Sequence, residues 1–110
     1  MTFILDLHLQ VVPLRWLSPE ALFEDDYSTK SDVWSFGCLL WEVCNQAALP
    51  WSHLKDQGVV ACLEKKERRW GDVDGVPEKL RPILFECGDY CPRKRPTFSA
   101  ILDTLDKIQL

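Results

Sequence analysis

The sequence predicts a mainly α-helical fold in which about five helices surround one buried central helix. Three observations support this fold class. Residues 32–43 are apolar on nearly every side, which is typical of a helix enclosed by other helices. Residues 98–108 place apolar side chains at helical spacing, with charged residues on the opposite face. Between these two segments, Gly71, Gly75 and Pro77 interrupt the chain and separate further stretches of helical spacing.

The first elements are short. Residues 5–11 alternate apolar and polar side chains with a period of two, which predicts a half-buried strand. Ser18 is suited to cap a helix, with Pro19 at its first position and Glu20 in its first turn. We therefore expect a short helix that continues to about Phe23.

The central helix follows a polar break. Either Ser28 or Ser31 can cap it, because a serine hydroxyl accepts from the unpaired amides of a first turn. After the apolar run of residues 32–43, residues 45–53 contain a proline and predict a loop. A helix over residues 54–66 is expected next.

The last two helices have clear starts. Residues 71–77 predict a second loop, and Pro77 is suited to the start of the helix whose apolar stripe covers residues 80–87. Gly88 is expected to end that helix or to loosen its last turn. Residues 97–108 form the most regular amphipathic pattern in the chain and predict its final helix.

Charge gives little attraction for nucleic acid or for anionic lipid. The net charge is −4 and the sequence pI is near 5.1, so we expect no nucleic-acid partner and no direct membrane contact. The only basic clusters are Lys65, Lys66, Arg68 and Arg69, and then Arg93, Lys94 and Arg95. We interpret both groups as solvated helix ends in preference to an anion-binding patch.

The five cysteines do not indicate a metal centre. They are scattered, and no His stands where it would complete a zinc site. Reduced thiols in the cytosol are the expected state, which predicts a cytoplasmic protein. No stretch reaches the roughly 18 apolar residues of a membrane span, and residues 1–10 make a poor signal peptide.

Three blocks of sequence resemble one family, in that family's order and at its spacing. Residues 13–21 (PLRWLSPEA) resemble the substrate-facing loop of tyrosine kinases running into the motif written A-P-E. Residues 27–37 (YSTKSDVWSFG) resemble the start of the family's buried central helix. Cys87 with residues 92–98 (PRKRPTF) resembles the segment that leads into its last helix. The chain is thus similar to the C-terminal part of a protein-kinase C-lobe of the tyrosine-kinase type. The resemblance covers residues 12–110, leaves residues 1–11 unmatched, and implies a partial domain that lacks the N-lobe.

The resemblance implies roles for two sets of residues. The substrate-facing loop would consist of Pro13, Leu14, Arg15 and Trp16. Glu20 and Arg95 would meet as a buried ion pair that ties this loop to the helical base. Without the resemblance, these would be two unrelated surface charges, because Glu and Arg are almost never fully buried unless paired.

Three residues of the central helix also have roles by resemblance. Asp32 would hold the backbone of the catalytic loop, whereas on its own it would be a first-turn acid facing water. Trp34 is a packing residue under either interpretation. Gly37 costs a helix about 1 kcal/mol relative to Ala, which a close contact with another segment would offset. The sequence departs from the family pattern at Gly88, where kinases usually have Trp.

The groups that perform phosphoryl transfer are not in this sequence. It contains no G-x-G-x-x-G, no V-A-I-K lysine, no H-R-D-x-x-x-x-N and no D-F-G. We therefore expect no catalytic, cofactor-binding or metal-binding residue in the chain. ATP and Mg²⁺ would belong only to a complete, active relative.

Residues 13–32 look most similar to the receptor-type pseudokinases of the off-track and colon-carcinoma-kinase group. That resemblance implies a signalling scaffold that binds protein partners through its helical surfaces and packs against the missing N-lobe and upper C-lobe. Its parent would be a single-pass plasma-membrane receptor with this part inside the cell. Two alternatives stay open, which are a truncated piece of an active protein-tyrosine kinase and an unstable chain without function.

Overall fold

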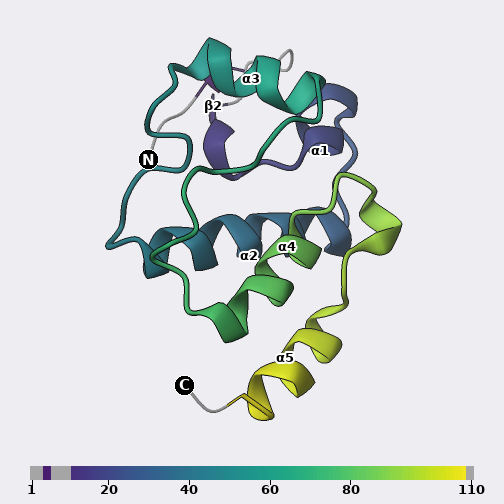
Figure 1. The fold of residues 1–110 in the computed structure, drawn as a ribbon. Helices are drawn as coiled ribbons and strands as arrows, with labels where there is room; N and C mark the ends of the chain where they lie inside the picture. The colour runs from purple at the N-terminus through teal and green to yellow at the C-terminus, as the bar shows by residue number, and fades with distance from the viewer. Residues whose placement is uncertain (1–3, 6–10, 109–110) are drawn as a thin grey trace.

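The computed structural model describes residues 4–5 and 11–108, and within them the fold is mainly helical, as predicted (Figure 1). Its five α-helices are α1 (Pro19–Glu24), α2 (Thr29–Cys44), α3 (Asp56–Glu64), α4 (Arg81–Cys87) and α5 (Phe98–Asp106). Three short 3₁₀ turns accompany them: η1 (Leu14–Trp16) precedes α1, η2 (Glu78–Leu80) precedes α4 and η3 (Pro92–Lys94) precedes α5. None of the helices in the described part of the chain is long and apolar enough to cross a bilayer.

A small β-ribbon precedes the helices. Strand β1 (Ile4–Leu5) pairs antiparallel with β2 (Val11–Val12), with Ile4 opposite Val12. Leu5 lies opposite Val11 in this ribbon, so the prediction of a single strand over residues 5–11 was wrong, and its two ends belong to two antiparallel strands. Its middle, residues 6–10, lies outside the described residues.

Serine caps define the starts of the first two helices. The Ser18 hydroxyl accepts from the Ala21 amide, as expected for the cap of α1. Ser28 caps α2 by accepting from the Ser31 amide, and the Ser31 hydroxyl accepts from the Ser28 amide in return. Both candidate serines therefore take part in one capping box. This cap starts α2 at Thr29, before the apolar run on which the prediction rested.

Two predicted boundaries were wrong. Helix α3 is shorter than the predicted range of 54–66 because Leu54 belongs to a turn, and because Lys66 adopts the left-handed region at φ 55°. The helix expected to begin at Pro77 starts only at Arg81, after the 3₁₀ turn η2. Pro82 then occupies the second position of α4, where no backbone N–H is needed.

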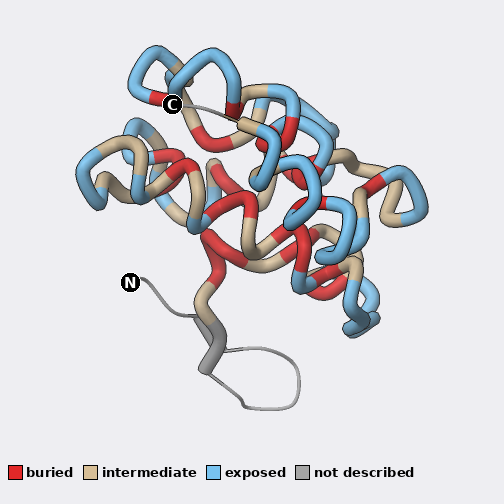
Figure 2. The backbone as a smooth tube through the Cα atoms, turned by 90° about the horizontal axis from the view of Figure 1, so that it is seen from below, coloured by how far each residue is buried: buried red, intermediate tan, exposed pale blue. Residues whose placement is uncertain are grey.

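Helix α2 runs through the middle of the molecule, with α1 and α3 on one side and α4 and α5 on the other (Figure 1). Buried backbone gathers along this central region in Figure 2. The core is rich in tryptophan, with Trp34, Trp41, Trp51 and Trp70 all buried. Gly37 lets α4 come close, since a Cβ there would lie 2.9 Å from Cys87 Cβ.

Helix α2 forms the buried centre of the fold, as predicted, but one stripe of it is open to solvent. Leu39 is 50% exposed and Val43 is 68% exposed. The elements that pack most closely on α2 are η1, α4 and η3, and they leave this stripe uncovered. An apolar strip of α2 therefore faces outward.

Candidate functional site

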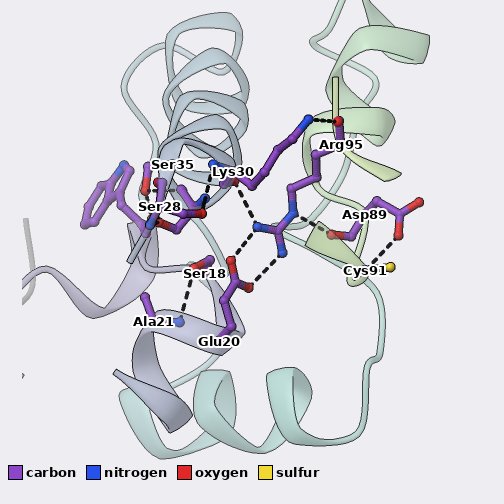
Figure 3. A network of polar contacts seen from close by, with 11 residues as sticks. Ser18, Glu20, Ala21, Ser28, Lys30, Ser35, Asp89, Cys91 and Arg95 are labelled. Carbon is purple, nitrogen blue, oxygen red and sulfur yellow. Dashed lines mark hydrogen bonds and ion pairs between the residues drawn. The ribbon is translucent and has the colours of Figure 1, made fainter. Parts of the chain in front are cut away.

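The structure brings Glu20 and Arg95 together as an ion pair (Figure 3). Arg95 Nη1 lies 2.7 Å from Glu20 Oε2, and Nη2 lies 2.9 Å from Oε1. The Arg95 side chain is fully buried, and that of Glu20 is 10% exposed. The two parallel bonds give the pair the fork geometry that arginine forms with carboxylates.

The rest of the Arg95 guanidinium is also occupied. Its Nε donates to the Asp89 carbonyl at 2.8 Å, and Nη1 donates to the Lys30 carbonyl at 2.9 Å. The Lys30 ammonium donates in return to the Arg95 carbonyl at 2.6 Å (Figure 3). One face of the guanidinium lies 5.1 Å from the ring centre of Trp34. Arg95 therefore joins α1, α2 and the segment around η3 in a single network.

This network sets the charge state of Glu20. Burial by itself raises the pKa of the Glu20 carboxyl, but the hydrogen bonds and the positive charge of Arg95 oppose it. The balance leaves the pKa of Glu20 below its ordinary value of 4.5. The carboxylate is therefore charged at neutral pH, as the ion pair requires.

The predicted substrate-facing loop forms the turn η1, and most of its side chains point inward. Leu14 is 0% exposed, Arg15 4% and Trp16 7%, whereas Pro13 is half-buried. The Trp16 indole donates to Glu42 Oε1 at 3.0 Å. A role in substrate binding remains a prediction, and it would fall to Pro13 and the backbone of the loop.

Arg15 anchors this turn to the loop that precedes α3. Its Nη1 donates to the carbonyls of Pro50 and Trp51 at 2.8 and 2.7 Å. Its Nη2 donates to the Leu54 carbonyl at 2.7 Å and lies 3.1 Å from Asp56 Oδ1. The sequence did not indicate this role, because the acceptors are backbone carbonyls that carry no residue signature.

Replacing Arg15 by lysine should lower the free energy of unfolding by about 1–3 kcal/mol, because one ammonium cannot reach carbonyls on both sides of the fork. Urea unfolding followed by circular dichroism measures the change. Arg93→Lys is the matched control, since Arg93 is exposed. Equal urea midpoints for the two variants would contradict the anchoring role.

The remaining predicted residues lie along α2. Asp32 is exposed in the first turn, and its carboxylate has no partner within the described residues. Trp34 is fully buried, with ring centres 6.5 Å from Trp70 and 5.4 Å from Tyr90. Its indole Nε1 is a buried donor without an acceptor in the part of the chain that the structure covers. The role of Asp32 toward a catalytic loop remains a prediction.

The basic group after α3 contains one residue that sequence reasoning missed. Lys65, Lys66 and Arg68 are exposed, as expected for a solvated helix end. Arg69 is half-buried, and its guanidinium lies 5.7 Å from the ring centre of Tyr90. No local signal marks it, because the aromatic residues of α4 and the following loop lie far along the chain.

No cluster of three or more metal-ligating side chains occurs in residues 4–5 and 11–108. All five cysteines are free thiols. The polar groups gathered around η1 and Arg95 thus bind the chain to itself. This arrangement fixes the position of a loop.

Known proteins are similar to this chain in sequence. The sequence model of the family described as protein tyrosine and serine/threonine kinase matches residues 6–105. Inactive tyrosine-protein kinase 7 of Mus musculus is 46% identical over 94 residues, and that of Gallus gallus is 43% identical. Tyrosine-protein kinase-like otk of Drosophila willistoni is 39% identical over 98 residues.

These matches cover 86–88% of the chain but only 9% of each relative. The chain therefore spans about a tenth of the length of these relatives. The family match, the similarity to these relatives and the helical fold around α2 agree: the chain belongs to the protein tyrosine and serine/threonine kinase family, as a helical piece of a tyrosine-kinase-like domain.

Proposed function

We propose that this chain serves as a docking scaffold of a tyrosine-kinase-like pseudokinase and that it does not itself transfer phosphate. The observation that carries the proposal is that the buried charged groups of the chain bind to other groups of the same chain. Arg15 and Arg95 spend their hydrogen-bond donors on the chain's own carbonyls and carboxylates. Phosphoryl transfer depends on charged groups that point at phosphates and metal ions. The buried charges of this chain stabilise its fold instead.

Two further findings support the proposal. The sequence contains none of the family's catalytic motifs. The relatives from chicken and mouse are named inactive tyrosine-protein kinase 7. In this proposal the chain lies on the cytoplasmic side of a single-pass receptor, where its five thiols stay reduced.

The partners in this proposal are proteins that contact the helical surfaces. The outward strip of α2, with Leu39 and Val43, is apolar and exposed. In the complete parent, the upper part of the C-lobe would cover such a strip, because apolar side chains at this density favour burial. Other helical faces would then remain available to separate signalling proteins.

The chain should show no saturable thermal shift with Mg-ATP. A ligand that binds only the folded state raises the melting temperature as its concentration passes its Kd, and this chain lacks the glycine-rich loop, the V-A-I-K lysine and the D-F-G with which the family holds the phosphates and the metal of ATP. Differential scanning fluorimetry over a range of Mg-ATP concentrations tests this, with Mg-citrate as an ionic control. A saturable shift specific to ATP would overturn the proposal.

The parent transcript distinguishes the scaffold from the alternative of an active kinase fragment. Intact H-R-D-x-x-x-x-N and D-F-G motifs upstream of this segment would favour an enzyme that phosphorylates protein tyrosines. Altered versions of both motifs would favour the pseudokinase.

A further inference from the structure

A hollow of about 320 Å³ lies between the segment that follows α3 and the outer side of α4. Its lining includes Lys66, Glu67, Arg68, Arg69, Phe85 and Tyr90. It therefore combines cationic groups with two aromatic rings. It lies outside the Glu20 and Arg95 network and shares no residue with it.

Arg69 is held in a fixed position inside this hollow. Its guanidinium lies 5.6 Å from the ring centre of Trp70, 6.0 Å from that of Phe85 and 5.7 Å from that of Tyr90. Its Nη1 donates to the Gly88 carbonyl. The Tyr90 hydroxyl is fixed in turn, because it donates to the Glu67 carbonyl at 2.6 Å. Rings on several sides and one carbonyl thus hold the charged group in place.

The donors of Arg69 are largely unused, which separates it from the two buried arginines, Arg15 and Arg95. Arg15 donates to three carbonyls and Asp56, and Arg95 donates to Glu20 and two carbonyls. A guanidinium has five N–H donors, and only one bond of Arg69 has an acceptor within the described residues. A positioned guanidinium with spare donors is suited to bind an anion through two parallel bonds.

The charge and the shape of the hollow define the anion. The hollow is lined by three cations, Lys66, Arg68 and Arg69, and by one anion, Glu67, so its net charge is 3 − 1 = +2. Neither Lys66 nor Arg68 forms an ion pair within the described residues. A phosphorylated side chain carries about −1.5 to −2 charges at neutral pH. Phe85 is 42% exposed and offers a ring face to a flat apolar group. We propose that this hollow binds a phosphotyrosine side chain of a protein partner.

This inference rests on the proposed scaffold function and gives it a partner chemistry. Phosphate bound beside Arg69 would complete the bonds that the chain leaves open. The aromatic ring of the same residue would lie against Phe85 and Tyr90. A basic group that the sequence marks as a solvated helix end thereby becomes part of a recognition site.

Fluorescence anisotropy with the complete 110-residue chain tests the proposal. The probe is a fluorescein-labelled peptide of Gly and Ser with one central phosphotyrosine. It should bind saturably, and the same peptide with unmodified tyrosine should bind at least about tenfold more weakly, because charge-assisted hydrogen bonds contribute most of the affinity. A phosphoserine peptide should also bind more weakly, since it lacks the ring.

Charge reversal locates the site. Lys66→Glu combined with Arg68→Glu should weaken binding of the phosphotyrosine probe by about tenfold or more. Lys65→Glu is the matched control, because Lys65 is the exposed neighbour and does not line the hollow. All three substituted residues are exposed, and circular dichroism verifies that the variants fold.

Several results would overturn the proposal. These are no saturable binding of the phosphotyrosine probe, equal binding of the phosphoserine peptide, or equal weakening by Lys65→Glu and by the double variant. Such a result would reject the phosphotyrosine site but not the scaffold function, which the Mg-ATP experiment tests separately. A specific response to Mg-ATP would remove that function while the peptide data still stood.

Discussion

Replacing Arg95 by methionine is expected to lower the free energy of unfolding by about 3–5 kcal/mol, one of the two largest effects in this chain. Methionine keeps most of the apolar volume but removes the guanidinium. The Glu20 carboxylate, whose side chain is only 10% exposed, then lacks its partner. The carbonyls of Lys30 and Asp89 lose their donors as well. Urea unfolding monitored by tryptophan fluorescence measures the loss.

The matched control is Arg93→Met, which makes the same change at an exposed position two residues earlier. It should change the free energy of unfolding by less than about 0.5 kcal/mol. The double variant of Glu20→Gln and Arg95→Met should lose less free energy of unfolding than the sum of the two single variants. The reason is that Glu20→Gln removes the charge that Arg95→Met leaves unpaired. Equal midpoints for Arg95→Met and Arg93→Met would rule out a structural ion pair.

The pH dependence of stability gives a second readout of the same pair. The pKa of Glu20 is lowered in the folded chain, so the unfolded chain binds the proton more tightly. The stabilisation is therefore complete above the ordinary pKa of 4.5 and is lost as the pH falls through the lower folded value. Urea midpoints between pH 7 and pH 3 should show this decline. Glu20→Gln should make the decline shallower.

Replacing Trp70 by alanine should lower the free energy of unfolding by about 3–5 kcal/mol, which is the other large effect expected for this chain. The Trp70 side chain is fully buried and packs against Trp34. Its Nε1 donates to Cys38 Sγ at 3.2 Å, and burial raises the pKa of that thiol to about 12, so the sulfur accepts as a neutral thiol. Urea unfolding measures the cost. A loss below about 1 kcal/mol would show that the core repacks around the missing indole.

Substitutions at Gly88 and at Trp70 should have coupled effects on the free energy of unfolding. A Cβ at Gly88 would lie 2.5 Å from Trp70 Cη2, so Gly88→Ala is expected to cost about 1–3 kcal/mol in the native sequence. The backbone at Gly88 has φ −93°, which alanine adopts without strain. In the Trp70→Ala background the added methyl enters vacated space, and the cost of Gly88→Ala should largely disappear.

Gly58→Ala is the control for this cycle. Its Cβ would meet only side-chain atoms of Leu54, at 3.2 Å and beyond, so it should change stability little in either background. An equal cost for Gly88→Ala in both backgrounds would contradict the coupling. The pairing also accounts for the departure from the family pattern. Where kinases usually have Trp, this chain has Gly88, and the indole of Trp70 fills the adjoining space.

The features that the sequence predicted well are local ones. Ser18 and Ser28 cap helices through amides a few residues away, so the pattern that marks them lies within a single turn. Gly37 in an otherwise apolar helix indicated a close approach, and the structure supplies Cys87 as the contact. The resemblance to a family, rather than any spacing, paired Glu20 with Arg95.

The features that the sequence missed depend on the tertiary fold. Arg15 appeared to belong to a substrate-facing loop, but its acceptors are carbonyls near Trp51 that no residue type identifies. Trp70 has φ 59°, an uncommon backbone conformation for a tryptophan that places its indole beside Gly88. Arg69 was interpreted as one of several surface cations because two of its three aromatic neighbours, Phe85 and Tyr90, come from later elements.

The ion pair also constrains how the chain can fold during synthesis. Glu20 and Arg95 are separated by 75 positions, so the carboxylate emerges from the ribosome long before its partner. At roughly 5–20 residues per second, the delay is about 4–15 s. Throughout that time α1 lacks this bond to the segment around η3, and only contacts with earlier elements, such as that of Trp16 with Glu42, can hold this region. The ion pair can therefore form only after the segment around η3 has emerged, when most of the chain has already been made.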